Sequence, residues 1–315
     1  MKSQFSLFIV CIFMISFYEV NAYGNCTISS HNSQNYRPVV VYHGLGDSAC
    51  SFFSMKPFMN MIERHLPGIY IRSVMIGDTG LKDREDGFFV QANKQIEIAA
   101  EQIAADPKLA GGFNCIGLSQ GGQFLRAYVE RYNSPPVHNL ITLGGQHQGV
   151  FAFPDTCVND TQLCETLRQL LTFGAYLPWV QESVTPANYW HNSLHPEEYQ
   201  TKNIFLPDIN NDGSFNATYK KNMLSLNAFV MVKFLNDTVV VPRASEWFGF
   251  YDDGSDTKTH SLQESELYQK DTIGLKQLDN QNKLVFLSTL GEHLQFTEKW
   301  FVENILPYLN NTLLN

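Results

Sequence analysis

The stretch CIGLSQGGQF at residues 115–124 decides how the rest of the chain can fold. An apolar run, FNCIGL, ends just before Ser119, and a helix-like run, QGGQFLRAYVERY, begins just after it. The pentapeptide from Gly117 to Gly121 has the pattern Gly-x-Ser-x-Gly, in which the glycines remove side chains that would collide at a sharp turn. The helix that starts at Gln120 aims backbone N–H groups at the serine. This context predicts that Ser119 is an exposed nucleophile on a strained turn.

Apolar runs and helix-like runs alternate around this turn, from Pro38 to Gly145. The predicted strands are PVVVYHG, IYIRSVMIG, FNCIGL and NLITLGG. The predicted helices are FFSMKPFMNMIERHLPG, QGGQFLRAYVERY and one long helix, FFVQANKQIEIAAEQIAADPKLAGG, that ends before Pro107. Strands separated by helices of this length imply a mostly parallel central sheet with right-handed crossovers and flanking helices.

The alternation stops between about residues 150 and 227, where aromatic residues and prolines are frequent. Leu163, Leu167, Leu170 and Leu171 form one helical face in this segment. We interpret the segment as a helical, lid-like insertion in a single domain that spans residues 23–315; an independent second domain is the alternative. The sheet resumes with NAFVMVKFL and KLVFLSTL, and EKWFVENILPYL forms a closing helix.

The N-terminus has the features of a secretory signal. Lys2 precedes an apolar run from Phe5 to Phe17, and small residues lead up to a cleavage point after Ala22. The run is shorter than the ~20 residues that span a bilayer, and no later segment is long and apolar enough, so we expect no transmembrane segment in the mature chain. The net charge of −9, from 31 acidic and 22 basic residues, argues against nucleic acid as a partner.

Entry into the secretory pathway gives meaning to cysteines and glycosylation sequons. Cys157 and Cys164 lie close enough in sequence to close a small disulfide loop. The spacing of Cys26 and Cys50 does not decide whether these two cysteines pair with each other. Cys115 lies in the apolar run before Ser119 and is expected to be a buried free thiol. Asn-x-Ser/Thr sequons predict glycosylation at Asn25, Asn159, Asn216, Asn236 and Asn310.

A serine nucleophile needs a base and an acid that orients it, here expected in the order Ser, Asp, His. His293 directly follows the last predicted strand, and Asp237 follows the strand before it, so both belong at the sheet edge where functional residues collect. His260 lies in a polar stretch and is expected to be solvated. The other candidate acids have no strand to position them: Asp208, Asp212, Asp252 and Asp253.

The developing oxyanion needs two N–H donors. We assign them to Gln120, the residue after the nucleophile, and to Leu45 in the turn HGLGDS. His43, before that turn, is expected to be structural, and His147 is expected to line the site. DINNDGSFNATY begins like a calcium loop but has Tyr219 where a glutamate is required. We therefore predict no metal site and no cofactor.

Six blocks of sequence together resemble the palmitoyl-protein thioesterase family: YHGLGDS, GLSQGGQFLRA, LITLGGQHQGVF, FVMVKFLND, SEWFGFY and GEHLQ. The resemblance runs from about Pro38 to Leu309. It implies an α/β-hydrolase fold in which Ser119 is the nucleophile, Asp237 the acid and His293 the base. It also implies removal of long fatty acyl groups from the cysteine thioesters of S-palmitoylated proteins or peptides, or from acyl-CoA. The implied location is the lysosome, reached through the secretory pathway, with secretion as a second destination.

The chain departs from the family pattern at several positions. Ala49 stands beside Cys50 where relatives carry two adjacent cysteines, and Ala100 and Tyr132 replace further cysteines, so one disulfide of the family is expected to be missing. Val241 stands where relatives carry a second aspartate, so no other acidic residue close to Asp237 competes with it for the role of the acid in the triad. The alternatives are a carboxylesterase or lipase acting on oxygen esters, and a binding protein without activity, although an intact triad argues against the latter.

Overall fold

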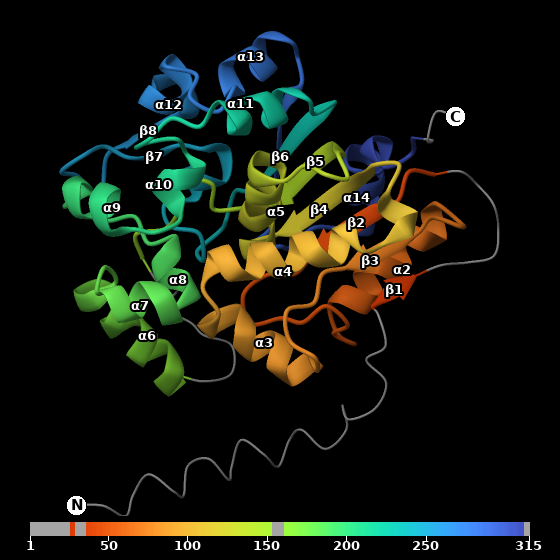
Figure 1. The fold of residues 1–315 in the computed structure, drawn as a ribbon, viewed down its shortest axis with the longest axis horizontal. Helices are drawn as coiled ribbons and strands as arrows, with labels where there is room; N and C mark the ends of the chain where they lie inside the picture. Colours follow the sequence, from red (N-terminus) through yellow and green to blue (C-terminus); the bar gives the residue numbers. More distant parts are fainter. Residues whose placement is uncertain (1–25, 29–35, 153–160, 312–315) are drawn as a thin grey trace, which may run out of the picture.

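The computed structural model describes residues 26–28, 36–152 and 161–311 (Figure 1). The expected signal segment, the sequons at Asn25 and Asn159, and Cys157 lie outside these ranges, and with Cys157 so does its predicted disulfide. Among the described residues, no helix has both the length and the apolarity that crossing a bilayer requires.

The centre of the molecule is a seven-stranded sheet with the order β1-β3-β2-β4-β5-β6-β9. Every neighbouring pair is parallel except β1 and β3. The strands are β1 (Thr27–Ile28), β2 (Val39–Tyr42), β3 (Ile71–Ser73), β4 (Phe113–Leu118), β5 (Val137–Leu143), β6 (Ala228–Phe234) and β9 (Leu284–Thr289). The prediction of a mostly parallel sheet is confirmed.

Helices cover both faces of the sheet. In β2, Val39 and Val41 join the apolar cluster of α2 (Met55–His65) and α14 (Glu298–Asn304), whereas Val40 and Tyr42 join the cluster of α4 (Ala92–Ala104) and α5 (Gln120–Arg131). Successive residues of a strand point to opposite faces, so this split places the helices in two layers around the sheet. The three-layer arrangement, with the serine turn between β4 and α5, is the α/β-hydrolase fold.

The segment between β5 and β6 is helical, as predicted, and gathers on one side of the sheet (Figure 1). Its helices are α6 (Thr161–Gly174), α7 (Pro178–Ser183), α8 (Thr185–Asn188), α9 (Pro196–Lys202), α10 (Leu206–Ile209) and α11 (Ala217–Leu224). Leu167 and Leu171 of α6 pack with Val180, Val184 and Trp190 in a small apolar cluster of their own. The segment thus builds a satellite core beside the main one.

The prediction of one long helix that starts at Phe88 and ends before Pro107 is correct at its end and wrong at its start. The structure has α3 (Gly80–Phe89), then a break, then α4, and finally a short 3-10 turn at Pro107–Leu109. Val90 and Gln91 are extended at the break (φ −100°, ψ 122° and φ −54°, ψ 148°). The Val90 carbonyl accepts hydrogen bonds from Gln95 Nε2 and Thr185 Oγ1, both at 2.6 Å. These contacts replace the helical bonds that the sequence pattern led us to expect.

The polar stretch between β6 and β9 holds more regular structure than the sequence suggested. It contains a 3-10 helix η2 (Arg243–Trp247), the two-stranded antiparallel hairpin β7 (Phe250–Tyr251) and β8 (Thr259–His260), η3 (Leu262–Glu264), α12 (Glu266–Gln269) and α13 (Leu275–Asn280). After α14 the described chain closes with η4 (Leu306–Tyr308).

The cysteines with described side chains are now placed. Cys26 and Cys50 form a disulfide, with sulfurs 2.04 Å apart, that ties β1 to the loop after β2. The sequence had left this pairing open. Cys115 is buried and free, as predicted, and burial raises the pKa of its thiol far above the ordinary value.

Candidate active site

Ser119 lies on a strained turn between β4 and α5. Its backbone has φ 53° and ψ −121°, a conformation that residues with a Cβ rarely adopt. The turn is possible because the chain has glycines at the close approaches. A Cβ on Gly121 would lie 2.3 Å from the Tyr42 carbonyl oxygen, and one on Gly117 would lie 2.3 Å from Gly122 Cα. The sequence pattern therefore has the steric basis that we inferred for it.

Asp237, which is buried, and His293, which is partly exposed, form a pair just after the ends of β6 and β9. Asp237 Oδ2 is 2.5 Å from His293 Nδ1, and Asp237 Oδ1 accepts the N–H groups of Val239 at 2.6 Å and Val240 at 2.9 Å. Burial alone would raise the pKa of Asp237, but the bond to His293 and the two backbone donors outweigh it and hold that pKa below its ordinary value. Asp237 is thus an ionised carboxylate that fixes the imidazole.

The neighbouring strand ends bring this pair toward Ser119. The Ser119 N–H donates to the Leu143 carbonyl at 2.8 Å, at the end of β5. The next residue, Gly144, packs under the histidine ring: a Cβ there would lie 2.9 Å from His293 Cε1. Ser119 and His293 therefore flank the same two residues at the carboxyl edge of the sheet, as their positions after parallel strands predict.

The turn after β2 passes beside the serine. A Cβ on Gly44 would lie 3.1 Å from Ser119 Cβ and 3.8 Å from its hydroxyl oxygen. Leu45 follows directly and is partly buried. Gln120 is the first residue of α5, where backbone N–H groups have no acceptor within the helix. Both predicted oxyanion donors therefore belong to segments that border Ser119.

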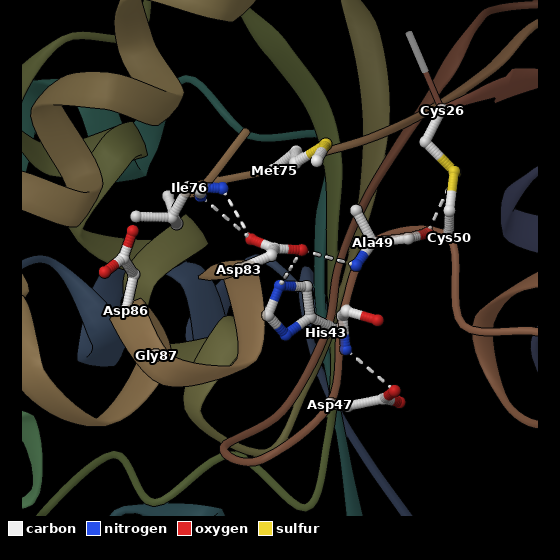
Figure 2. A network of polar contacts seen from close by, with 12 residues as sticks. Cys26, His43, Asp47, Ala49, Cys50, Met75, Ile76, Asp83, Asp86 and Gly87 are labelled. Atoms are coloured by element: carbon white, nitrogen blue, oxygen red, sulfur yellow. Dashed lines mark hydrogen bonds and ion pairs between the residues drawn. A yellow bond between two sulfur atoms is a disulfide. The ribbon is translucent and has the colours of Figure 1, made fainter. Parts of the chain in front are cut away.

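A buried network supports this turn from behind (Figure 2). His43 Nδ1 lies 2.9 Å from the Gly44 carbonyl, and His43 Nε2 lies 3.3 Å from Asp83 Oδ2. Asp83 of α3 also accepts the N–H groups of Ala49 at 2.7 Å and Ile76 at 2.6 Å. Burial lowers the tendency of His43 to carry charge, but the bond to Asp83 and the charge of Asp83 outweigh this and raise the pKa of His43. The expected structural role of His43 is confirmed.

The side chain of Gln120 links the serine turn to the inserted segment. Its amide nitrogen donates to the Gly87 carbonyl at 3.2 Å, and its oxygen accepts the Tyr189 hydroxyl at 2.9 Å. Tyr189 follows α8, so the insertion reaches the residue beside Ser119. Because the side chain is anchored on both sides, α5 is held at a fixed angle to the turn.

The remaining candidates lie elsewhere. His260 is in β8 and bonds Asp252 at 3.0 Å, while Asp208 pairs with Arg131 at 2.6 Å. The expectation that His147 lines the site is wrong: the residue is fully buried and its ring stacks on Phe248 with centroids 4.5 Å apart. Burial lowers the pKa of His147 well below its ordinary value, as suits a core side chain.

Two acidic residues near the site, Asp83 and Glu246, were not predicted from the sequence. Asp83, which fixes His43, lies in GLKDREDG, a helix that the pattern did not reveal. Glu246 lies in the block SEWFGFY, which carried the family resemblance but was given no role; the structure buries it against Asp237. Only the repetition of that block across the family could have singled it out from sequence.

Of the five predicted glycosylation sites, the three within the described ranges are exposed: Asn216, Asn236 and Asn310. Glycosylation at these three residues stays a prediction. No group of three or more potential metal ligands occurs within the described ranges.

Comparison with known proteins places the chain in a family. The model for the family described as palmitoyl protein thioesterase matches residues 38–293. Palmitoyl-protein thioesterase 1 of Caenorhabditis elegans is 44% identical over 280 residues, covering 89% of this chain and 94% of the relative. Palmitoyl-protein thioesterase 3 of Dictyostelium discoideum is 38% identical over 281 residues, covering 87% and 93%. The lysosomal thioesterase PPT2 of Homo sapiens is 30% identical over 246 residues, covering 78% and 77%. The chain belongs to the palmitoyl protein thioesterase family.

Proposed function

We propose that this thioesterase hydrolyses long-chain S-acyl thioesters through Ser119, His293 and Asp237. The observation that carries the assignment is the juxtaposition at one sheet edge: a serine on a strained turn, and a histidine bonded to a buried aspartate 2.5 Å away. The substrates are S-palmitoylated proteins or peptides and other long-chain acyl thioesters. Family membership favours thioesters over the oxygen esters of a carboxylesterase or lipase.

The reaction follows from the roles of these groups. Ser119 Oγ attacks the thioester carbonyl while its proton passes to His293 Nε2, and the N–H groups of Leu45 and Gln120 receive the developing oxyanion. The carbon–sulfur bond breaks, and His293 returns the proton to the leaving thiol. Water then attacks the acyl-serine by the same route and releases the fatty acid. Asp237 remains ionised throughout and stabilises the imidazolium.

The inserted segment, within one hydrolase domain, is proposed to hold the acyl chain. Leu167 and Leu171 of α6 are buried in the satellite core, but Phe173 of the same helix, Leu177 just before α7 and Trp179 of α7 are exposed. Each buried methylene contributes about 0.8 kcal/mol to binding. Catalytic efficiency should therefore rise from acetyl to palmitoyl thioesters.

The site of action is proposed to be the lysosome, reached through the secretory pathway. Relatives bear the name lysosomal thioesterase. The Cys26–Cys50 disulfide supports an oxidising route, because such bonds are rare in proteins that stay in the cytosol.

The test compares a palmitoyl-cysteine peptide with the matched palmitoyl-serine peptide. The wild-type protein should favour the thioester, and Ser119→Ala should lose about 10⁴-fold or more of the activity while remaining folded. His260→Ala, which removes a side chain of β8 that is paired with Asp252, is the matched control and should retain activity. A Ser119→Ala protein with a tenth of wild-type activity would refute the assignment.

A further inference from the structure

Glu246 is a buried acid that the mechanism leaves without a role. It lies in η2, packed against β6, and it is fully buried. Its Oε2 accepts the Phe234 N–H at 3.0 Å. Its Oε1 is also buried, and it receives no hydrogen bond from an N–H or hydroxyl group of the described residues. A buried carboxylate oxygen without a donor is costly, which indicates that this oxygen carries a proton.

The partner of that proton is the triad aspartate. Glu246 and Asp237 are both bonded to Phe234, whose N–H donates to Glu246 Oε2 at 3.0 Å and whose carbonyl accepts the Asp237 N–H at 3.1 Å. The Asp237 carboxyl acts on that of Glu246 both through its charge and as a side-chain hydrogen-bond partner. Two carboxylates have no hydrogen to share, so the contact requires one proton between them. Asp237 already accepts three hydrogen bonds, from His293, Val239 and Val240, whereas Glu246 accepts one. More donors favour the ionised form, so the proton belongs on Glu246.

We propose that Glu246 is a positioning residue of the triad, which stays protonated during the reaction and donates a hydrogen bond to Asp237. The inference rests on the proposed triad role of Asp237. Glu246 becomes a fourth member of the proposed triad, and no proton leaves it in any step.

The charges around the pair agree with this assignment. Burial, followed by the negative charge of Asp237, raises the pKa of Glu246 to about 10. The charged groups that face the pair are His293 beyond Asp237, Lys233 of β6 and Arg243 of η2. Lys233 favours the ionised form of Glu246, but its effect is smaller than the effects of burial and of the Asp237 charge. Its ammonium lies 3.6 Å from the centre of the Trp247 ring.

The hydrogen bond from Glu246 has a consequence for catalysis. When a carboxylate accepts an additional hydrogen bond, part of its negative charge is offset by the new donor. Its attraction to the imidazolium beside it is therefore weaker. The protonated imidazole, which cannot accept the serine proton, is then stabilised less than it would be beside an unassisted aspartate. Loss of the Glu246 donor should move the acid limb of the kcat/KM profile to higher pH.

The proton can be observed directly, without substrate. Infrared difference spectra of the wild-type protein and Glu246→Gln, both labelled with ¹³C-glutamate, are recorded at pH 8. At this pH Glu130, whose pKa burial raises to about 7, is mostly ionised and Glu246 is not. We expect a carboxylic-acid C=O band that Glu246→Gln removes. Absence of this band from the wild-type protein overturns the proposal, even if a less conservative variant fails to fold.

The pH dependence of kcat/KM distinguishes three possibilities for Glu246: a protonated side chain that donates to Asp237, an ionised side chain, and a side chain that only fills space. Glu246→Gln keeps an N–H donor for Asp237 and an acceptor for Phe234, so its acid midpoint should stay within about 0.3 pH units of the wild type. Glu246→Met has similar length and no donor, and its midpoint should rise by about half to one pH unit. Exposed Glu303→Met controls for the loss of one acidic residue and should leave the profile unshifted.

Two results contradict the proposal. A midpoint that falls in Glu246→Gln shows that Glu246 is ionised in the native protein. An unshifted midpoint in a folded Glu246→Met shows that its role is packing alone. Failure of the triad assignment is distinguishable, because it appears as activity in Ser119→Ala and leaves the infrared band unaffected.

Discussion

Ser119 and His293 occupy their positions because the residues beside them lack side chains. Gly44 leaves room next to the serine, and Gly144 leaves room under the imidazole ring. Neither glycine takes part in bond making. At the scale of single residues, the geometry of the site therefore depends on the space that these glycines leave as well as on Ser119 and His293 themselves.

Gly144→Ala should reduce kcat/KM by about 100-fold or more, because a Cβ 2.9 Å from His293 Cε1 must displace the ring and a misplacement of about 1 Å costs that much. Gly144 also has φ +63°, so backbone strain needs a control. Gly254 has φ +78° with open space around its Cβ position. Gly254→Ala should lose similar stability and retain activity; equal losses of activity in both variants would contradict the steric account.

His43→Gln should destabilise the protein more at pH 5 than at pH 8. The folded state raises the pKa of His43, so the stabilisation from its contact with Asp83 is fully present below the unfolded pKa of about 6.5. It is lost as the pH rises through the higher folded pKa. Urea unfolding at both pH values measures the difference, and a destabilisation that grows toward pH 8 would show the opposite sign.

At the scale of elements, the sequence predicted what local pattern determines. The long apolar runs of β4, β5, β6 and β9 and the helix α5 appear within a few residues of their predicted places, and they set the positions of Ser119, Asp237 and His293. The break between α3 and α4 could not be predicted, because it depends on contacts of Val90 with Gln95 and Thr185. Glu246 could not be found either, because a glutamate in an irregular stretch gives no sign of burial.

Leu171→Ala in α6 should lower the free energy of unfolding by about 2–5 kcal/mol if the satellite core is part of the cooperative fold. Leu171 is 1% exposed and packs in that cluster. Leu177, a few residues later, is 47% exposed, and Leu177→Ala should cost less than about 1 kcal/mol. Equal effects in urea unfolding would show that the insertion is not packed as described.

At the scale of the whole molecule, one covalent link ties the edge of the sheet to the loop beside the site. The Cys26–Cys50 disulfide joins the start of the edge strand β1 to the segment that continues from the turn after β2. Through Asp83 the same segment is bonded to α3, and through Gln120 the serine turn is bonded to the insertion. The edge, the insertion and the core are thus connected through residues that surround Ser119.

Replacing Cys26 and Cys50 together by serine should lower the free energy of unfolding by about 3 kcal/mol. The two residues are 24 positions apart, and opening a loop of this size restores conformational entropy to the unfolded chain. Thermal unfolding of the double variant and the oxidised wild type measures the effect. A loss below about 1 kcal/mol would mean that the link contributes little to global stability.

The central claim, that Ser119 is the nucleophile and is activated by His293 and Asp237, is tested most directly by covalent labelling. The native protein is treated with a fluorophosphonate and the modified residue is located by peptide mass spectrometry. We predict one label per chain, on Ser119, formed in step with the loss of thioesterase activity and slowed by at least about 100-fold in His293→Ala. Inactivation with the label on another residue, or with Ser119 unmodified, would contradict the account.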